Sequence, residues 1–145
     1  MKNLGAIAVL LLGAFFWLVE EGYILPEGGS DPSFTTPYSS PVAFDRSDSS
    51  QQVQGQGVVA RVLSDDNTGS RHQRFILELS SGQTILVAHN IDLAPRVPSL
   101  REGDTVEFFG EYEWNDQGGV VHWTHHDPNG RHLDGWLKAG GRTYQ

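Results

Sequence analysis

The chain has 145 residues and a formal net charge of -8, with 18 acidic residues, 10 lysines and arginines, and no cysteine. This length suits one domain of ordinary size. The acidity argues against a general nucleic-acid binder, whose surface is usually basic, and the lack of cysteine excludes disulfides, thiolate metal sites, cysteine nucleophiles and a lipoprotein anchor.

The N-terminal segment predicts export. Residues 4–19 are apolar and uncharged, Lys2 precedes them, and Glu20 and Glu21 follow. This charge distribution places the N-terminus in the cytoplasm. The run is longer than a signal-peptide core of about 7–15 residues and shorter than a span of about 20, and no small-residue cleavage site follows it. We predict that residues 1–21 are an uncleaved signal anchor in the inner membrane that exposes the chain on its periplasmic face. A cleaved signal peptide, giving a periplasmic or secreted protein, is the alternative.

The next segment, residues 22–53, reads as a disordered tether. Four prolines interrupt a stretch that is rich in serine, glycine, threonine and glutamine. This composition is typical of extended linkers that do not form a core.

From residue 54 onward the pattern changes to short strands separated by turns. Alternating apolar and β-branched residues predict five strands, at 57–63, 74–80, 84–89, 105–114 and 120–126. Two prolines argue against a long helix in the connection 91–104. Gly110, inside the fourth strand, predicts a bulge or a sharp bend. NDQGG (115–119) and DPNG (127–130) are turn signals.

Three strands, a connection and two more strands are typical of a five-stranded OB-type barrel. We therefore predict an all-β fold in which residues 54–145 form one OB-like domain. An SH3-like barrel and a small sandwich are the alternative layouts.

Two stretches of this domain carry a resemblance: SRHQRFILELSSGQTILVAHNIDLAP and GEYEWNDQGGVVHWTHHDPNGRHLDGW. They resemble a family of small exported bacterial proteins described as a domain of unknown function. The likeness covers nearly all of residues 54–145 and leaves out the tether. It implies an exported, OB-like single domain in a Gram-negative bacterium, and it implies no activity and no functional residue.

The histidines are the first candidates for chemistry, because four of the six lie in VHWTHHDPNGRH, residues 121–132. Strand alternation places His122, Thr124 and His126 on one face of the fifth strand, and Val121 and Trp123 on the core face. His72 and His89 lie at the ends of the second and third strands.

A barrel that brings these strand ends together predicts a metal site. Its candidate ligands share imidazole or carboxylate donors: His72, His89, His122, His126 and Asp127. Neutral imidazole is a common metal ligand, and a donor set without sulfur suits a divalent ion such as Zn, Cu, Ni or Fe. The alternative is that these histidines are polar residues that bond backbone carbonyls around the turns.

The arginines predict an anion site. The candidate ligand-binding residues combine guanidinium and imidazole groups: Arg71, His72, Arg74, Arg131 and His132. Guanidinium forks bind phosphate and carboxylate with two hydrogen bonds, although a surface ion pair is the ordinary role of an arginine.

Taken together, these patterns predict an exported, membrane-tethered OB-fold module that binds a metal or an anionic small ligand. A metal-dependent hydrolase, a phosphodiesterase or nuclease, is the first alternative. There a metal would activate water and arginine would stabilise the transition state, with catalytic candidates His122, His126, Arg74 and Arg131. An envelope interaction protein is the second. Aromatic residues on the last two strands suit a stacking platform, but the neighbouring glutamates of the fourth strand disfavour nucleic acid as a partner.

Overall fold

The computed structural model describes residues 42–145, which form seven strands and one short 3-10 helix. Their bounds are η2 (Arg46–Asp48), β1 (Gln51–Val62), β2 (His72–Leu79), β3 (Thr84–Asn90), β4 (Thr105–Glu113), β5 (Val120–His122), β6 (Trp136–Ala139) and β7 (Arg142–Tyr144). The predicted anchor, residues 1–21, and the predicted tether up to residue 41 lie outside the described residues. Within residues 42–145 no helix is long and apolar enough to cross a membrane.

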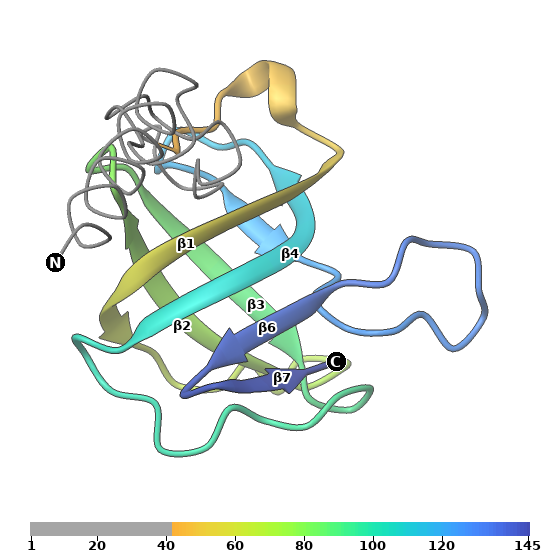
Figure 1. The fold of residues 1–145 in the computed structure, drawn as a ribbon. Coiled ribbons are helices and arrows are strands. Elements are labelled where there is room, and N and C mark those ends of the chain that lie inside the picture. The colour runs from red at the N-terminus through yellow and green to blue at the C-terminus, as the bar shows by residue number, and fades with distance from the viewer. Residues whose placement is uncertain (1–41) are drawn as a thin grey trace, which may run out of the picture. The chain divides into compact units, whose positions relative to one another are not determined.

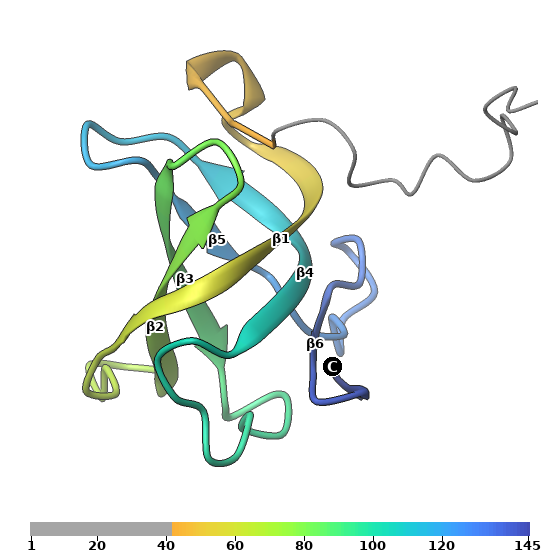
Figure 2. The ribbon, with the colours of Figure 1, turned by 60° about the vertical axis from the view of Figure 1, so that its left-hand side comes forward.

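The first five strands close into a barrel, as Figures 1 and 2 show. Their order is β1-β2-β3-β5-β4, and β4 pairs in turn with β1. The β3–β5 pairing is parallel, whereas β1–β2, β2–β3, β4–β5 and β1–β4 are antiparallel. This arrangement confirms the predicted all-β, OB-type barrel.

The barrel core comes from alternate positions along the strands, because successive side chains of a strand point to opposite faces. On β2, Phe75, Leu77 and Leu79 are buried, as the alternation predicts. They pack in one cluster with the inward residues of the other strands, Val59, Ile85, Val87, Val106, Phe108, Tyr112, Val121 and Leu137. The outward positions of β2, β3, β4 and β5 are therefore left for a surface site.

The folded domain begins before residue 54. β1 starts at Gln51 and pairs with β4 from its first residue, where Gln51 lies opposite Tyr112. The side chain of Phe44 packs against Phe108 and Tyr112, and its backbone N–H donates to Gln83 Oε1 over 2.8 Å. The part of the predicted tether that the structure describes, residues 42–53, thus belongs to the barrel domain.

The fifth strand is shorter than predicted. β5 ends at His122, because Trp123 has a φ of 54° and so turns the chain out of the extended conformation. Residues 123–135, here called the histidine loop, then extend away from the barrel as the blue loop in Figure 1. β6 returns to pair with the part of β4 that β5 leaves open. The expected alternation beyond His122 was therefore wrong: Thr124 is buried and Trp123 is only half-buried.

Gly110 marks a close backbone approach and not a bulge. The β1–β4 register continues without a shift past Gly110, and the register shift of the barrel lies in β1, between Val59 and Arg61. A Cβ atom at Gly110 would lie 2.4 Å from the carbonyl oxygen of His122. Glycine is therefore needed here so that β4 and the end of β5 can meet.

Candidate functional site

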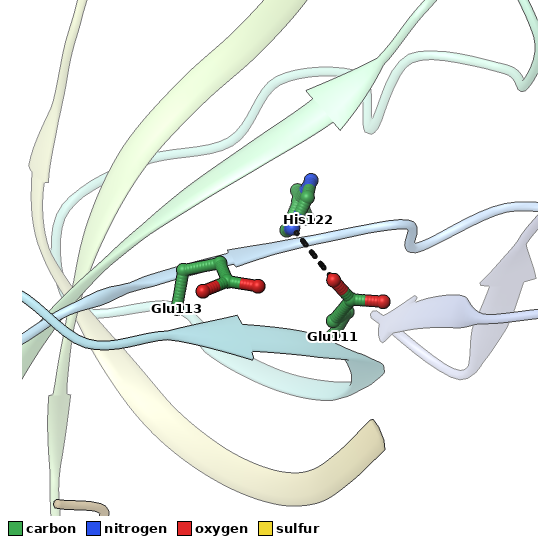
Figure 3. A group of neighbouring side chains, drawn as sticks. All are labelled: Glu111, Glu113 and His122. Atoms are coloured by element: carbon green, nitrogen blue, oxygen red, sulfur yellow. Dashed lines mark ion pairs between the residues drawn. The ribbon is translucent and has the colours of Figure 1, made fainter. Parts of the chain in front are cut away.

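The β4–β5 hairpin brings two glutamates to the histidine at the end of β5. Glu111 lies opposite His122, and Glu113 lies opposite Val120. Both glutamates project from the same face of β4, two residues apart, toward the imidazole (Figure 3). One ligand atom from each of Glu111, Glu113 and His122 lies within 4.8 Å of the others, so this group has the geometry to hold a metal ion.

The imidazole of His122 has an unpaired buried nitrogen. Its Nε2 atom lies 3.6 Å from Oε1 of Glu111, which is longer than a hydrogen bond, and this buried atom has no hydrogen-bond partner. Burial lowers the pKa of His122 below its usual 6.5, against the opposing effect of Glu111 and Glu113. The ring is therefore neutral near pH 7, and a neutral ring has a lone pair for a metal.

The carboxylates of the site are held by hydrogen bonds from outside it. The two oxygens of Glu113 accept the hydroxyl groups of Ser49 and Ser50, each over 3.0 Å. Oε2 of Glu111 is hydrogen-bonded to Nε2 of His132. Such outer partners orient metal-ligating carboxylates in known metal sites. Ser49 and Ser50 lie in the stretch that the sequence assigned to the tether.

His132 reaches Glu111 from the histidine loop. Its ring stacks on Trp123 with 4.1 Å between the ring centroids and an angle of 8°, and its Nδ1 lies 2.8 Å from the carbonyl oxygen of Leu133. Burial opposes a charge on His132, but the bonds to Glu111 and to this carbonyl outweigh it and raise its pKa. The bond from His132 in turn lowers the pKa of Glu111.

The other polar residues of the histidine loop stabilise the loop itself. The carboxylate of Asp127 accepts the backbone N–H groups of residues 129, 131 and 132, and the N–H of Gly130 closes the predicted turn on the Asp127 carbonyl over 3.0 Å. His126 pairs with Asp134 over 2.8 Å. Asp127 and His126 are therefore not brought together with His122, contrary to the predicted ligand set.

His89 is a core residue. Its side chain is fully buried, Nδ1 lies 2.7 Å from Oγ1 of Thr124, and Nε2 lies 3.0 Å from the carbonyl oxygen of Pro95. A carbonyl accepts, so Nε2 carries the proton and Nδ1 accepts from the threonine hydroxyl. Desolvation by burial lowers the pKa of His89 to about 4. Both ring nitrogens of His89 are hydrogen-bonded, so His89 has no nitrogen left to bind a metal ion, although it was among the predicted ligands.

Two predicted residues do meet His122. His72 and Arg74 line the same hollow of about 270 Å³ as His122 and Glu113, together with Asp66, Ala88 and Val120. A larger groove of about 810 Å³ follows β1 and the end of β2, but Glu78 is the one titratable residue that lines it. The smaller hollow therefore carries more titratable side chains than this larger groove.

The remaining arginine candidates lie elsewhere. Arg71 pairs with Asp92 over 2.8 Å at an exposed position, and this contact lowers the pKa of Asp92. Arg131 is exposed in the histidine loop, where its backbone N–H donates to Asp127. Neither arginine lines the hollow beside His122, so the predicted ligand-binding set divides between separate places.

Sequence reasoning missed the role of Glu111 and Glu113, although a signal was present. The turn at 115–119 was predicted, and an antiparallel hairpin centred on it pairs Glu113 with Val120 and Glu111 with His122. Following that register along the hairpin would have placed both glutamates beside His122.

Comparisons with known proteins identify the family of the chain and no function. Searches of curated proteins and of solved structures give no significant match. A family model, Protein of unknown function (DUF3465), matches residues 29–145 and so covers the whole barrel and part of the preceding segment. The chain therefore belongs to the DUF3465 family of proteins of unknown function.

Proposed function

We propose that this chain is an exported, membrane-tethered OB-type module whose barrel binds a divalent metal ion through Glu111, Glu113 and His122. The observation that carries the proposal is the buried Nε2 atom of His122, which has no hydrogen-bond partner and faces two carboxylates. A buried polar atom without a partner costs roughly 1–3 kcal/mol. A metal ion would remove that cost and offset the charge of the carboxylates.

The donor set suggests which ions suit the site. Imidazole favours Zn, Cu, Fe or Ni, and carboxylates favour harder ions such as Mn, so we expect Zn²⁺ first and Mn²⁺ second. Three protein ligands leave a coordination position open for water or for a bound molecule, as in catalytic zinc sites. The hydrogen bonds to Glu111 and Glu113 supply the outer support that such ligands need.

Zinc titration of the full-length chain tests the proposal. The chain is purified without a histidine tag in a maltoside detergent, titrated calorimetrically and analysed for bound metal. We expect the chain to bind one equivalent of Zn²⁺. Binding should be at least about tenfold weaker in His122→Ala and Glu113→Gln, because loss of a residue that only hydrogen-bonds a metal ligand already lowers metal affinity by about 10–100-fold. His126→Ala and Glu107→Gln are matched controls that keep the wild-type affinity. Absent binding, or equal binding in His122→Ala, would contradict the metal site.

The proposed location of the barrel rests on the N-terminal segment. The apolar run at 4–19, with Lys2 before it and Glu20 after it, supports an anchor in the inner membrane with the barrel in the periplasm. Fractionation of cells, alkaline extraction of membranes and N-terminal sequencing test this together. An intact N-terminus in the membrane fraction with protease-accessible barrel in spheroplasts is expected, and a cytoplasmic soluble chain would refute export.

A metal-dependent hydrolase is the second candidate function. It is favoured by the open coordination position and by Arg74 in the adjoining hollow, since metal-bound water and a guanidinium serve phosphodiester cleavage. Turnover of bis-p-nitrophenyl phosphate that needs the metal and is lost in His122→Ala would establish it. Metal binding without turnover would favour the binding module over the hydrolase. Co-purification of an envelope protein, without metal binding, would favour the envelope interaction protein.

A further inference from the structure

We infer that the hollow beside the metal site binds a phosphate-type oxyanion, and that it does so only when the metal ion is present. This inference rests on the proposed metal site, and it assigns the class of molecule that the open coordination position would take. The hollow lies on the outer face of the barrel and is shared by β2, β3, β5, the end of β4 and the β1–β2 loop.

The hollow exists because a small residue lies between two large polar ones. Arg74 pairs with Ala88 across β2 and β3. Strands β3 and β5 are parallel, and Val87 pairs with Val121. The residues that follow these two, Ala88 and His122, are therefore neighbours on the outer face. The methyl group of Ala88 leaves space between the guanidinium on one side and the imidazole on the other. A bound group can therefore contact both sides at once.

Arg74 supplies a positioned cation. Its Nε donates to the carbonyl oxygen of Ser64 over 3.0 Å, which orients the guanidinium and leaves its terminal nitrogens for a ligand. Within residues 42–145 no carboxylate forms an ion pair with Arg74. This distinguishes Arg74 from Arg71 and Arg96, which pair with Asp92 and Asp65. A guanidinium edge with two N–H groups matches a tetrahedral oxyanion.

His72 adds a second nitrogen on the same side. Its Nδ1 lies 2.9 Å from the carbonyl oxygen of Ser70, so Nδ1 carries a proton. Nε2 is left to contact a bound molecule, and it donates a hydrogen bond when the ring is protonated. Arg74 and His72 lie two residues apart on β2 and so project from the same face.

The charges that line the hollow make anion binding conditional on the metal. Two carboxylates, Asp66 and Glu113, line the hollow, whereas Arg74 is its one guanidinium, so acidic groups outnumber the guanidinium without a metal. A divalent ion held by Glu111, Glu113 and His122 would add two positive charges beside the hollow and offset these carboxylates. The ion also gives the oxyanion a direct bond at the open position.

The size of the hollow limits the ligand to a small group. Its volume of about 270 Å³ lies below the roughly 300–1,000 Å³ of pockets that enclose whole small molecules. A phosphate group fits, with the remainder of its molecule outside. The phosphate can belong to a soluble ester or to a lipid headgroup, and both share the chemistry recognised here.

Calorimetric titration with methylphosphonate, a soluble phosphate mimic, tests the inference on the full-length chain in maltoside detergent. The zinc-loaded chain is expected to bind it, and the metal-free chain is expected to show no binding at the same concentrations; equal binding by the metal-free chain would overturn the inference. Arg74→Gln should weaken phosphonate binding about tenfold or more, since hydrogen bonds to charged groups are the strong ones, while zinc affinity stays within about twofold. Arg71→Gln is the matched control with wild-type binding of both.

The outcomes separate the two proposals. No zinc binding overturns both the metal site and this inference. Zinc binding without phosphonate binding, or phosphonate binding that is unchanged in Arg74→Gln, overturns the inference alone. A second arm compares glycerol 3-phosphate with vesicles of phosphatidic acid in wild type and Arg74→Gln. An Arg74-dependent preference for the vesicles assigns a lipid headgroup, and a preference for the soluble ester assigns a free metabolite.

Discussion

His89 gives a sharp prediction about the pH dependence of stability. In the folded barrel burial lowers its pKa to about 4, against 6.5 for an ordinary histidine. Between these values the unfolded chain binds a proton that the folded chain does not, so stability falls as the pH falls. At about 1.4 kcal/mol per pKa unit, the difference amounts to roughly 3 kcal/mol. This contribution is fully present above pH 6.5 and is lost between pH 6.5 and 4.

The measurement is urea unfolding of wild type and His89→Gln at several pH values between 4 and 8. Glutamine is neutral over this range and retains an N–H donor and an oxygen acceptor for the partners of His89, Thr124 and Pro95. The variant is less stable at pH 7.5, because glutamine does not reproduce the packing of the fully buried ring. Its stability should then fall by about 3 kcal/mol less than that of wild type on going to pH 4. Parallel pH profiles would show that folding does not lower the pKa of His89 and would refute the reasoning.

Three further predictions follow from the site and its surroundings. Gly110→Ala places a Cβ within 2.4 Å of the His122 carbonyl oxygen, so urea unfolding should show a loss of roughly 1–3 kcal/mol, and zinc affinity should fall because His122 is displaced. Asp127→Ala removes the acceptor of three backbone N–H groups, and hydrogen exchange at residues 129–132 should become faster while β1–β4 exchange stays unchanged. Zinc affinity should be constant from pH 8 to about pH 6.5 and decline only below it, because the pKa of His122 lies below 6.5; a decline that begins above pH 7 would contradict a neutral buried imidazole.

The strands of the barrel follow from local pattern to a large extent. On β2, Phe75, Leu77 and Leu79 occupy alternate positions and are all buried, and the turn residues separated the strands correctly. The pattern failed where the chain leaves the sheet. At Trp123 a φ of 54° ends β5, although VVHWTHH continues to alternate like a strand, because the β4 edge beyond this point is occupied by β6.

The start of the domain was also beyond local pattern. The stretch before Gln54 has the composition of a linker, yet β1 begins at Gln51 and Ser49 and Ser50 bond Glu113. These contacts span more than 60 residues of sequence. No pattern within a short window of the sequence records them.

By itself the sequence determined the all-β class and the barrel layout, and it offered His72 and Arg74 only among several candidate residues. The class and the layout follow from strand period and strand order, which are local properties. Only the tertiary structure decided which polar residues meet. Closure of the barrel buried His89 with Thr124, and hairpin register brought Glu111 and Glu113 to His122. In the loop, His126 pairs with Asp134, and Asp127 accepts backbone N–H groups of the loop itself. The histidine-rich stretch is thus not one site, because its side chains divide among the core, the proposed metal site and the loop once the chain departs from the sheet at Trp123.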